Sequence, residues 1–182
     1  MRKRSRQLVV DASIAHDAGS ESATHPTPVR CRAFLQEIAA HRGYTMVWTE
    51  AIAEEWRRHA SPFAIRWRVR MASTQRIVDV EGERDDALRE AIDLAAAALE
   101  AGGIMQKDAH LVEAALATTS RTVTSRDDRA RGWFARSTRR IPRLAKIVWV
   151  NPDVPEENPI DWLRGGAKPE PPRTLAHYLP PV

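Results

Sequence analysis

The sequence predicts an α/β protein, namely a three-layer α/β/α sandwich around a central parallel sheet, with a proline-rich C-terminal tail. Short apolar runs rich in β-branched residues alternate with stretches whose apolar residues recur at helical spacing. The apolar runs are continuous, which is typical of strands that a parallel sheet buries on both faces. Most of the 12 prolines lie beyond residue 150, where they disfavour regular structure.

Four apolar runs predict strands, and helical periodicity predicts six helices around them. Leu88, Ile92, Ala95 and Leu99 form one apolar stripe, so their helix has the clearest pattern. The polar segment 20–28 contains two prolines and is expected to be a loop. The strands are expected at 7–10, 45–49, 121–125 and 146–150, and the helices at 29–41, from 49 or 50 to the break at Pro62, from there to about 73, and at 83–100, 107–118 and 127–139.

Length and composition indicate one domain over residues 1–150 with an extension over 151–182. The formal net charge of +4 permits a polyanionic partner without requiring one. The single cysteine, Cys31, excludes a disulfide framework and a cysteine-built zinc site, and we expect it to serve packing. No apolar run approaches the ~20 residues of a membrane helix, and the basic start precedes too short an apolar run for a signal peptide. The expected location is therefore the cytoplasm.

Four carboxylates form the candidate site. Asp11 ends the first predicted strand, Asp127 follows the third, Asp108 begins a helix, and Glu55 lies in the helix after the second strand. Ligands of an open parallel sheet bind beyond the carboxyl ends of its strands, so Asp11 and Asp127 should converge. Clustered carboxylates repel each other unless a cation neutralises them, and Mg²⁺ and Mn²⁺ favour oxygen ligands. Such a site suits hydrolysis of a phosphodiester.

Each acid also has a purely structural interpretation, and spacing alone does not decide between the two. Asp11, Asp108 and Asp127 are all placed where a helix begins and can act as caps. Glu55 can be a solvated acid that pairs with a basic neighbour, either Arg58 or His59. His110 is two residues from Asp108 on one helix, so we expect it to point elsewhere and to be structural or solvent-facing.

Four segments, in order, resemble the motifs of the PIN-domain family. An apolar strand followed by Asp11-Ala-Ser13 is similar to the opening motif. The later segments are Thr49-Glu-Ala-Ile-Ala-Glu-Glu55-Trp56, Lys107-Asp108 at the start of an Ala-rich helix, and Val123-Thr-Ser125-Arg-Asp127-Asp128. Their register favours Glu55 over Glu54 and Asp127 over Asp128. The resemblance covers residues 7–150.

The resemblance implies a parallel sheet of four or five strands and an acidic Mg²⁺ or Mn²⁺ site that cleaves single-stranded RNA. On this basis Asp11 and Asp127 hold the ion most directly, while Glu55 and Asp108 ligate through water or orient the nucleophile. Many bacterial members are VapC-type toxins, which implies a small antitoxin partner and a homo-oligomer. The long loop after Asp11, the Arg/Trp-rich insert and the tail depart from the usual toxin. Three neighbouring side chains are expected to orient the carboxylates or metal waters: Ser13, Ser125 and Asp128.

Two other functions stay open at this point. The chain can be a catalytically inert scaffold of the same fold that binds RNA or a protein. A receiver-type phosphorylation domain also has an Asp at a strand end, but Glu21 and Lys146 are poor substitutes for its early acidic pair and late lysine. The segment 56–70 mixes tryptophans with arginines, so its aromatics either stack on RNA bases, anchor the core, or line an antitoxin or dimer groove.

Overall fold

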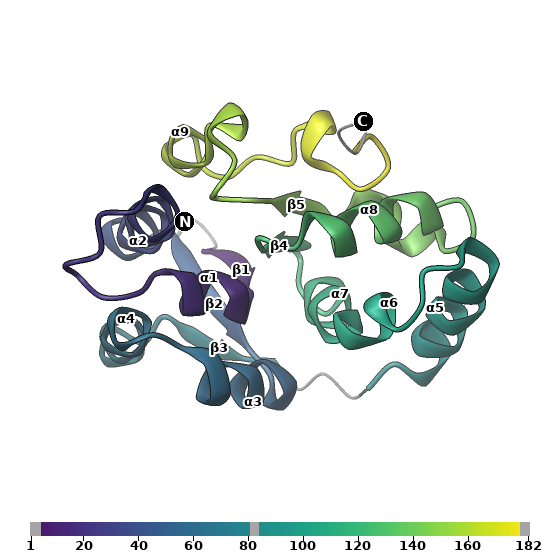
Figure 1. Ribbon diagram of the computed structural model, residues 1–182, viewed down its shortest axis with the longest axis horizontal. Helices are drawn as coiled ribbons and strands as arrows, with labels where there is room; N and C mark the ends of the chain where they lie inside the picture. Colours follow the sequence, from purple (N-terminus) through teal and green to yellow (C-terminus); the bar gives the residue numbers. More distant parts are fainter. Residues whose placement is uncertain (1–4, 81–83, 179–182) are drawn as a thin grey trace.

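Five parallel strands form one sheet between two layers of helices in the computed structural model, which describes residues 5–80 and 84–178 (Figure 1). The strand order is β3-β2-β1-β4-β5, and every pair is parallel. The predicted three-layer α/β/α fold is therefore confirmed. The strands are β1 (Arg6–Val10), β2 (Tyr44–Trp48), β3 (Ile77–Asp79), β4 (Thr122–Thr124) and β5 (Val148–Val150).

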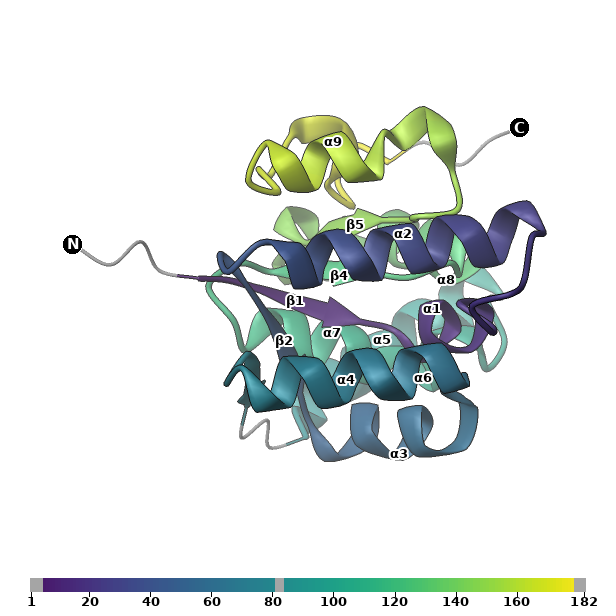
Figure 2. The same ribbon diagram turned by 90° about the vertical axis from the view of Figure 1, so that its left-hand side faces the viewer.

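The helices divide into one group on each face of the sheet. Figure 2 shows α2 (Pro26–Ala40) and α4 (Pro62–Ser73) in front of the strands, with α1 (Ala12–Asp17) and α3 (Glu50–His59) packed against them. The other face carries the remaining helices of the first 150 residues. These are α5 (Asp86–Leu99), α6 (Ile104–Lys107), α7 (Ala109–Leu116) and α8 (Asp128–Ser137).

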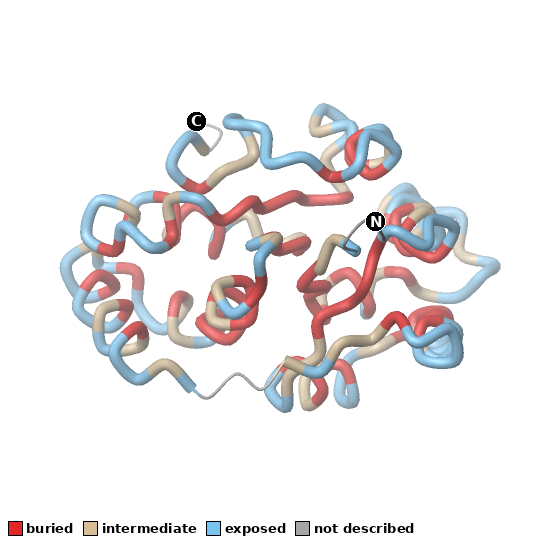
Figure 3. The backbone as a smooth tube through the Cα atoms, turned by 180° about the vertical axis from the view of Figure 1, so that it is seen from behind, coloured by how far each residue is buried: buried red, intermediate tan, exposed pale blue. Residues whose placement is uncertain are grey.

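Most residues of the central strands are buried, as Figure 3 shows by the red segments in the middle of the molecule. Leu8, Val9 and Val10 of β1 have no exposed surface, and burying each such side chain contributes roughly 1.5–3 kcal/mol. The chain runs outward from β1 to β2 and β3, then returns to the other side at β4. This reversal between β1 and β4 is the place where open α/β sheets open a crevice for ligands.

The C-terminal tail folds back onto the domain instead of extending from it. Trp162 and Leu163 of α9 (Pro159–Arg164) are buried in the common core, where α9 packs on α2. Leu175 donates its N–H to the carbonyl of Ile147 at 2.9 Å. Residues 151–178 therefore contain short helices packed on the domain, and the expectation that their prolines exclude regular structure is wrong. Prolines fit because they open short helices, where the N–H they lack has no partner anyway.

Other element boundaries differ from the expected ones for local reasons. Strand β3 was not predicted, because it has only three residues, of which Asp79 is polar and exposed. Helix α2 begins at Pro26, inside the expected loop, since proline suits the first helical turn. The expected helix 107–118 is two helices that meet at Asp108. The last strand begins at Val148, after a 3-10 turn over Pro142–Lys146.

The aromatics of segment 56–70 belong to the core. Trp56, Phe63 and Trp67 are all less than 9 % exposed, and the rings of Trp56 and Trp67 stack with centroids 6.0 Å apart. Trp67 also donates its indole N–H to the carbonyl of Leu35. The interpretation of these residues as core anchors is confirmed, so their rings are not free to stack on bases. Burial also raises the pKa of the Cys31 thiol to about 12, as expected for a packing residue.

No helix within residues 5–80 and 84–178 combines the length and the apolar character needed to cross a bilayer.

Candidate carboxylate site

The site lies at the carboxyl ends of β1 and β4, where the strand order reverses. Asp11 follows β1 directly, and its backbone N–H donates to the carbonyl of Thr124 at 3.0 Å. Ser125 continues β4 and donates its N–H to the carbonyl of Val150 at 3.1 Å. The two strand ends are thereby joined side by side, so the residues that follow them lie at the same edge of the sheet.

Two serines fix the Asp11 carboxylate. Its Oδ2 atom accepts hydrogen bonds from the hydroxyls of Ser13 and Ser125, the latter at 2.6 Å. Asp11 is 7 % exposed, and its side chain makes no capping hydrogen bond to α1. The capping interpretation therefore does not apply to Asp11. Ser13 and Ser125 make the orienting contacts that were expected of them, and Ser13 also accepts the N–H of Arg126 at 3.2 Å.

Asp108 is a buried carboxylate with one oxygen left unpartnered. It is 4 % exposed, and its Oδ1 atom lies 3.5 Å from the ammonium of Lys107. Its Oδ2 atom is buried and has no hydrogen-bond partner among the described residues. Burial raises the pKa of Asp108 to about 6. The negative charges of Asp11 and Asp127 also raise this pKa, whereas the positive charge of Lys107 lowers it. Asp108 makes no capping hydrogen bond to α7, so the capping interpretation is again unsupported.

Glu55 reaches the site because Trp56 ties α3 to β1. The indole N–H of Trp56 donates to the carbonyl of Val10 at 2.9 Å, one residue before Asp11. The Glu55 Oε2 atom lies 3.4 Å from Nε2 of His110. The neighbouring Glu54 turns the other way and forms ion pairs with Arg57 and Arg58. The register that favoured Glu55 over Glu54 thus agrees with the direction of the side chains, and Arg58 is not the partner of Glu55.

His110 lies beside Glu55 and is buried, so of its two expected positions the solvent-facing one is wrong. It is 7 % exposed, and its Nδ1 atom lies 3.1 Å from the carbonyl oxygen of Lys107. Burial disfavours the charged imidazole, but the contact with Glu55 outweighs it and raises the pKa of His110. The same contact holds the pKa of Glu55 below its ordinary value. The contact between Glu55 and His110 depends on how α3 packs against α7, and no sequence pattern signals it.

Asp127 and Asp128 have different surroundings. The Oδ1 atom of Asp127 accepts the N–H of Ala130 at 2.7 Å, so Asp127 caps α8 as its structural interpretation expected. Its charge still acts on Asp108. Asp128 accepts a hydrogen bond from the amide of Asn151 at 2.7 Å and lies near Arg131, so it contacts the tail segment instead of Asp11. Successive helical residues point about 100° apart, which explains the difference.

The tail also reaches the rim of the site. Arg126, between Ser125 and Asp127, forms ion pairs with Asp17 of α1 and with Asp153 of the tail. Asp153 additionally accepts the Thr27 hydroxyl at 3.0 Å. Burial raises the pKa of Asp153, but its hydrogen bonds from Thr27, Arg126 and Arg30 lower it further than burial raises it. Sequence reasoning did not identify this cluster, because it depends on where the tail docks.

A divalent cation fits these residues in part. All candidate donors are carboxylate oxygens, which suit Mg²⁺ and Mn²⁺, and the unpartnered Oδ2 of Asp108 is available for one. Within the described ranges, however, no group of three or more His, Cys, Asp or Glu side chains is arranged to hold an ion. Mg²⁺ commonly takes one or two protein carboxylates and fills its remaining positions with water or substrate phosphate. The arrangement accordingly fits an ion held mostly through water.

No protein-family model, curated protein or solved structure matches the chain.

Proposed function

We propose that the protein is a metal-dependent endoribonuclease that hydrolyses phosphodiester bonds of single-stranded RNA at the Asp11 site. The observation that carries the proposal is the buried, unpartnered Oδ2 of Asp108 beside the charges of Asp11 and Asp127. Leaving such a group unsatisfied costs about 1–3 kcal/mol, so its presence calls for a ligand or a role. A hard cation between these oxygens removes the cost.

Each side chain has a defined part in this proposal. Asp11, oriented by Ser13 and Ser125, and Asp108 would hold the ion, and Glu55 would act through water. Asp127 would also act through water and not bind directly as the resemblance implies, because its Oδ1 caps α8. A bound Mg²⁺ or Mn²⁺ supplies an activated water and neutralises charge on the phosphate. Glu55, whose Oε2 lies 3.4 Å from Nε2 of His110, would serve as the proton acceptor of the site. The resemblance to VapC-type toxins adds a small antitoxin as an inhibiting partner.

RNA cleavage in Mn²⁺ or Mg²⁺ tests the proposal, with an EDTA control and with Asp11→Asn beside the wild type. We expect metal-dependent cleavage that Asp11→Asn abolishes while the variant keeps its circular dichroism spectrum. The variant pair Glu55→Gln and Glu54→Gln is a matched control, because the two acids are adjacent but Glu54 faces Arg57 and Arg58. Only Glu55→Gln should lose activity. An active Asp11→Asn protein would contradict the proposal.

The second candidate is a catalytically inert scaffold, which the lack of a three-ligand group among the described residues favours. It differs from the enzyme in its response to metal. An ion that binds only the folded state increases the free energy of unfolding by mass action, by ~2.7 kcal/mol at a concentration one hundred times its Kd, and so raises the melting temperature. Mn²⁺ should therefore stabilise the enzyme and leave the scaffold unchanged. A protein that does not cleave RNA and is not stabilised by Mn²⁺ would be the scaffold.

A further inference from the structure

Two open hollows lie at the amino-terminal edge of the sheet, the edge opposite the carboxylates. One, of about 440 Å³, is formed where β1 and β2 begin and α9 ends. The other, of about 760 Å³, is formed where β1 begins and the chain enters β4. Arg6 lines both, so the hollows adjoin. No Asp or Glu lines either hollow, and the basic side chains that do are Arg6, Arg42, Arg121, Lys146, Arg164 and Lys168.

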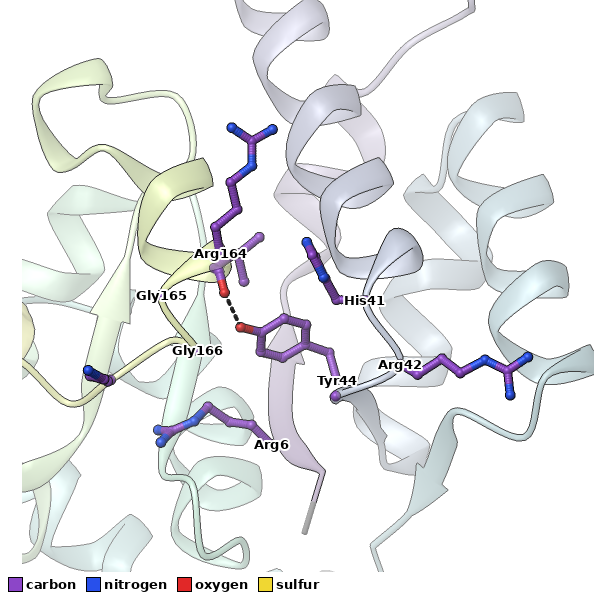
Figure 4. Close-up of a pocket in the computed structure, with 10 residues that line it drawn as sticks. Arg6, His41, Arg42, Tyr44, Arg164, Gly165 and Gly166 are labelled. Atoms are coloured by element: carbon purple, nitrogen blue, oxygen red, sulfur yellow. Dashed lines mark hydrogen bonds between the residues drawn. The ribbon is translucent and has the colours of Figure 1, made fainter. Parts of the chain in front are cut away.

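Figure 4 shows the smaller hollow between β2 and the tail. The Tyr44 hydroxyl donates to the carbonyl of Leu163 across it, which fixes the tail against the sheet. Arg6 extends from β1 toward the side of the tail, whereas Arg42 points away from Tyr44. Arg164 is neutralised by Glu37, at 3.0 Å. Neither Arg42 nor Arg164 therefore adds much free positive charge to the hollows, and the other basic side chains that line them supply it.

Among the described residues, five of these six cations lack an acidic partner, and one of the five, Arg42, points away from Tyr44. Within residues 5–80 and 84–178, neither Arg6, Arg121, Lys146 nor Lys168 takes part in an ion pair. Arg6 begins β1, Arg121 directly precedes β4, and Lys146 lies two residues before β5. Neighbouring strands are about 4.8 Å apart, so the three strand starts form a row roughly 10 Å long. Like charges in a row repel each other, and an anion that spans the row relieves this repulsion.

We propose that this basic edge, defined by Arg6, Arg121, Lys146 and Lys168, binds the phosphate backbone of single-stranded nucleic acid at a surface separate from the carboxylates. A row of cations matches successive phosphates better than a single phosphate, which needs donors converging on one point. Exposed hydroxyls such as that of Thr119 line the larger hollow and are common phosphate donors. Contacts of this kind are made to the phosphates and not to the base edges, so binding is expected to be independent of base sequence.

A lipid surface fits this edge less well. Membrane-binding surfaces combine basic residues with apolar side chains that enter the bilayer. The exposed large apolar side chains of the described chain are Val29, Ile65, Val69 and Leu94, and none lines either hollow. The hollowed edge, which carries none of these exposed apolar side chains, is suited to a flexible strand that follows its contour.

The test is binding of a fluorescent oligouridylate of about 12 nucleotides, followed by anisotropy in EDTA from about 50 to 200 mM salt. The triple variant Arg121→Gln, Lys146→Gln, Lys168→Gln changes three exposed residues of the edge. The charge-matched control Arg66→Gln, Arg68→Gln, Arg70→Gln removes three arginines from α4. Because cleavage is blocked by EDTA, the outcome is independent of the proposed nuclease function.

We expect the wild type to bind with a strong salt dependence. Each lost phosphate contact lowers the slope of log K against log salt by about 0.7 for a single strand, so the edge triple should lower it by about 2. The α4 triple should leave the slope unchanged. If the triple variant misfolds, the double variant Lys146→Gln, Lys168→Gln replaces it, because it keeps Arg121 and its positive φ of 47°. The double variant should lower the slope by about 1.4.

Three results would overturn the proposal. The first is that the wild type does not bind RNA. The second is that the α4 triple variant weakens binding as much as the edge triple variant. The third is that polyglutamate at equal charge displaces the RNA. The second result would assign the effect to net charge or to α4. The third would assign the edge to an acidic polypeptide.

Discussion

Asp108→Asn should stabilise the metal-free protein at alkaline pH, because the folded state holds this carboxylate in an unfavourable place. The pKa of Asp108 is raised from 3.8 to about 6, chiefly by burial. A group whose charged form is disfavoured by folding contributes no penalty below its unfolded pKa. The penalty grows as pH rises through the folded pKa and is complete above about 6. At ~1.4 kcal/mol for each tenfold change in the proton equilibrium, it amounts to roughly 3 kcal/mol.

The asparagine amide brings a cost of its own, because one of its polar atoms meets the same unpartnered surroundings as Oδ2. That cost does not depend on pH. The useful quantity is therefore the stability of Asp108→Asn minus that of the wild type, compared between about pH 4 and pH 8. We expect this difference to rise by about 2–3 kcal/mol, which corresponds to roughly 5–10 °C in melting temperature for a chain of this size.

The assay is thermal and urea unfolding in EDTA, followed by circular dichroism at both pH values. Asp93, an exposed carboxylate on α5, supplies the matched Asp93→Asn control for the chemistry of the substitution. Added Mn²⁺ should stabilise the wild type more than Asp108→Asn and so reduce the difference in stability between them. A stability difference that is the same at pH 4 and pH 8 would refute the reasoning, because it would mean that folding does not penalise the charged Asp108.

Three further predictions concern the tail and are checked by urea unfolding. Leu163→Ala should cost about 2–5 kcal/mol, because Leu163 is 1 % exposed in the core; a change below ~1 kcal/mol would mean that α9 is not docked. Arg131→Ala should cost about 3–5 kcal/mol, since it leaves Glu157 without the guanidinium 2.5 Å away; Arg131→Met with Glu157→Gln should recover part of the loss. Hydrogen bonds from Thr27, Arg126 and Arg30 keep the pKa of Asp153 low, so the stability that they contribute is present above about pH 4 and lost in acid. Asp153→Asn should remove this stability, and an equal loss at pH 3 and pH 7 would contradict the prediction.

The sequence predicted the strands and helices around the site better than it predicted the side-chain contacts within the site. The continuous apolar runs identified four of the strands, because burial on both faces leaves that pattern in any parallel sheet. The short edge strand β3 escaped, since three residues carry too little of the pattern. Prolines in the tail were taken as evidence against helices, yet Pro159 opens α9, where proline is favoured.

The chain order of Asp11, Glu55, Asp108 and Asp127, and their places at strand and helix ends, were determined by the sequence alone. Local propensity and periodicity are properties of neighbouring residues, so they can be read without a structure. Only the tertiary structure decided that Glu55 contacts His110, that Asp127 caps its own helix, and that the Oδ2 atom of Asp108 is buried without a partner. These facts depend on how α3, α7 and α8 pack against the ends of β1 and β4, and that packing is set by the whole core.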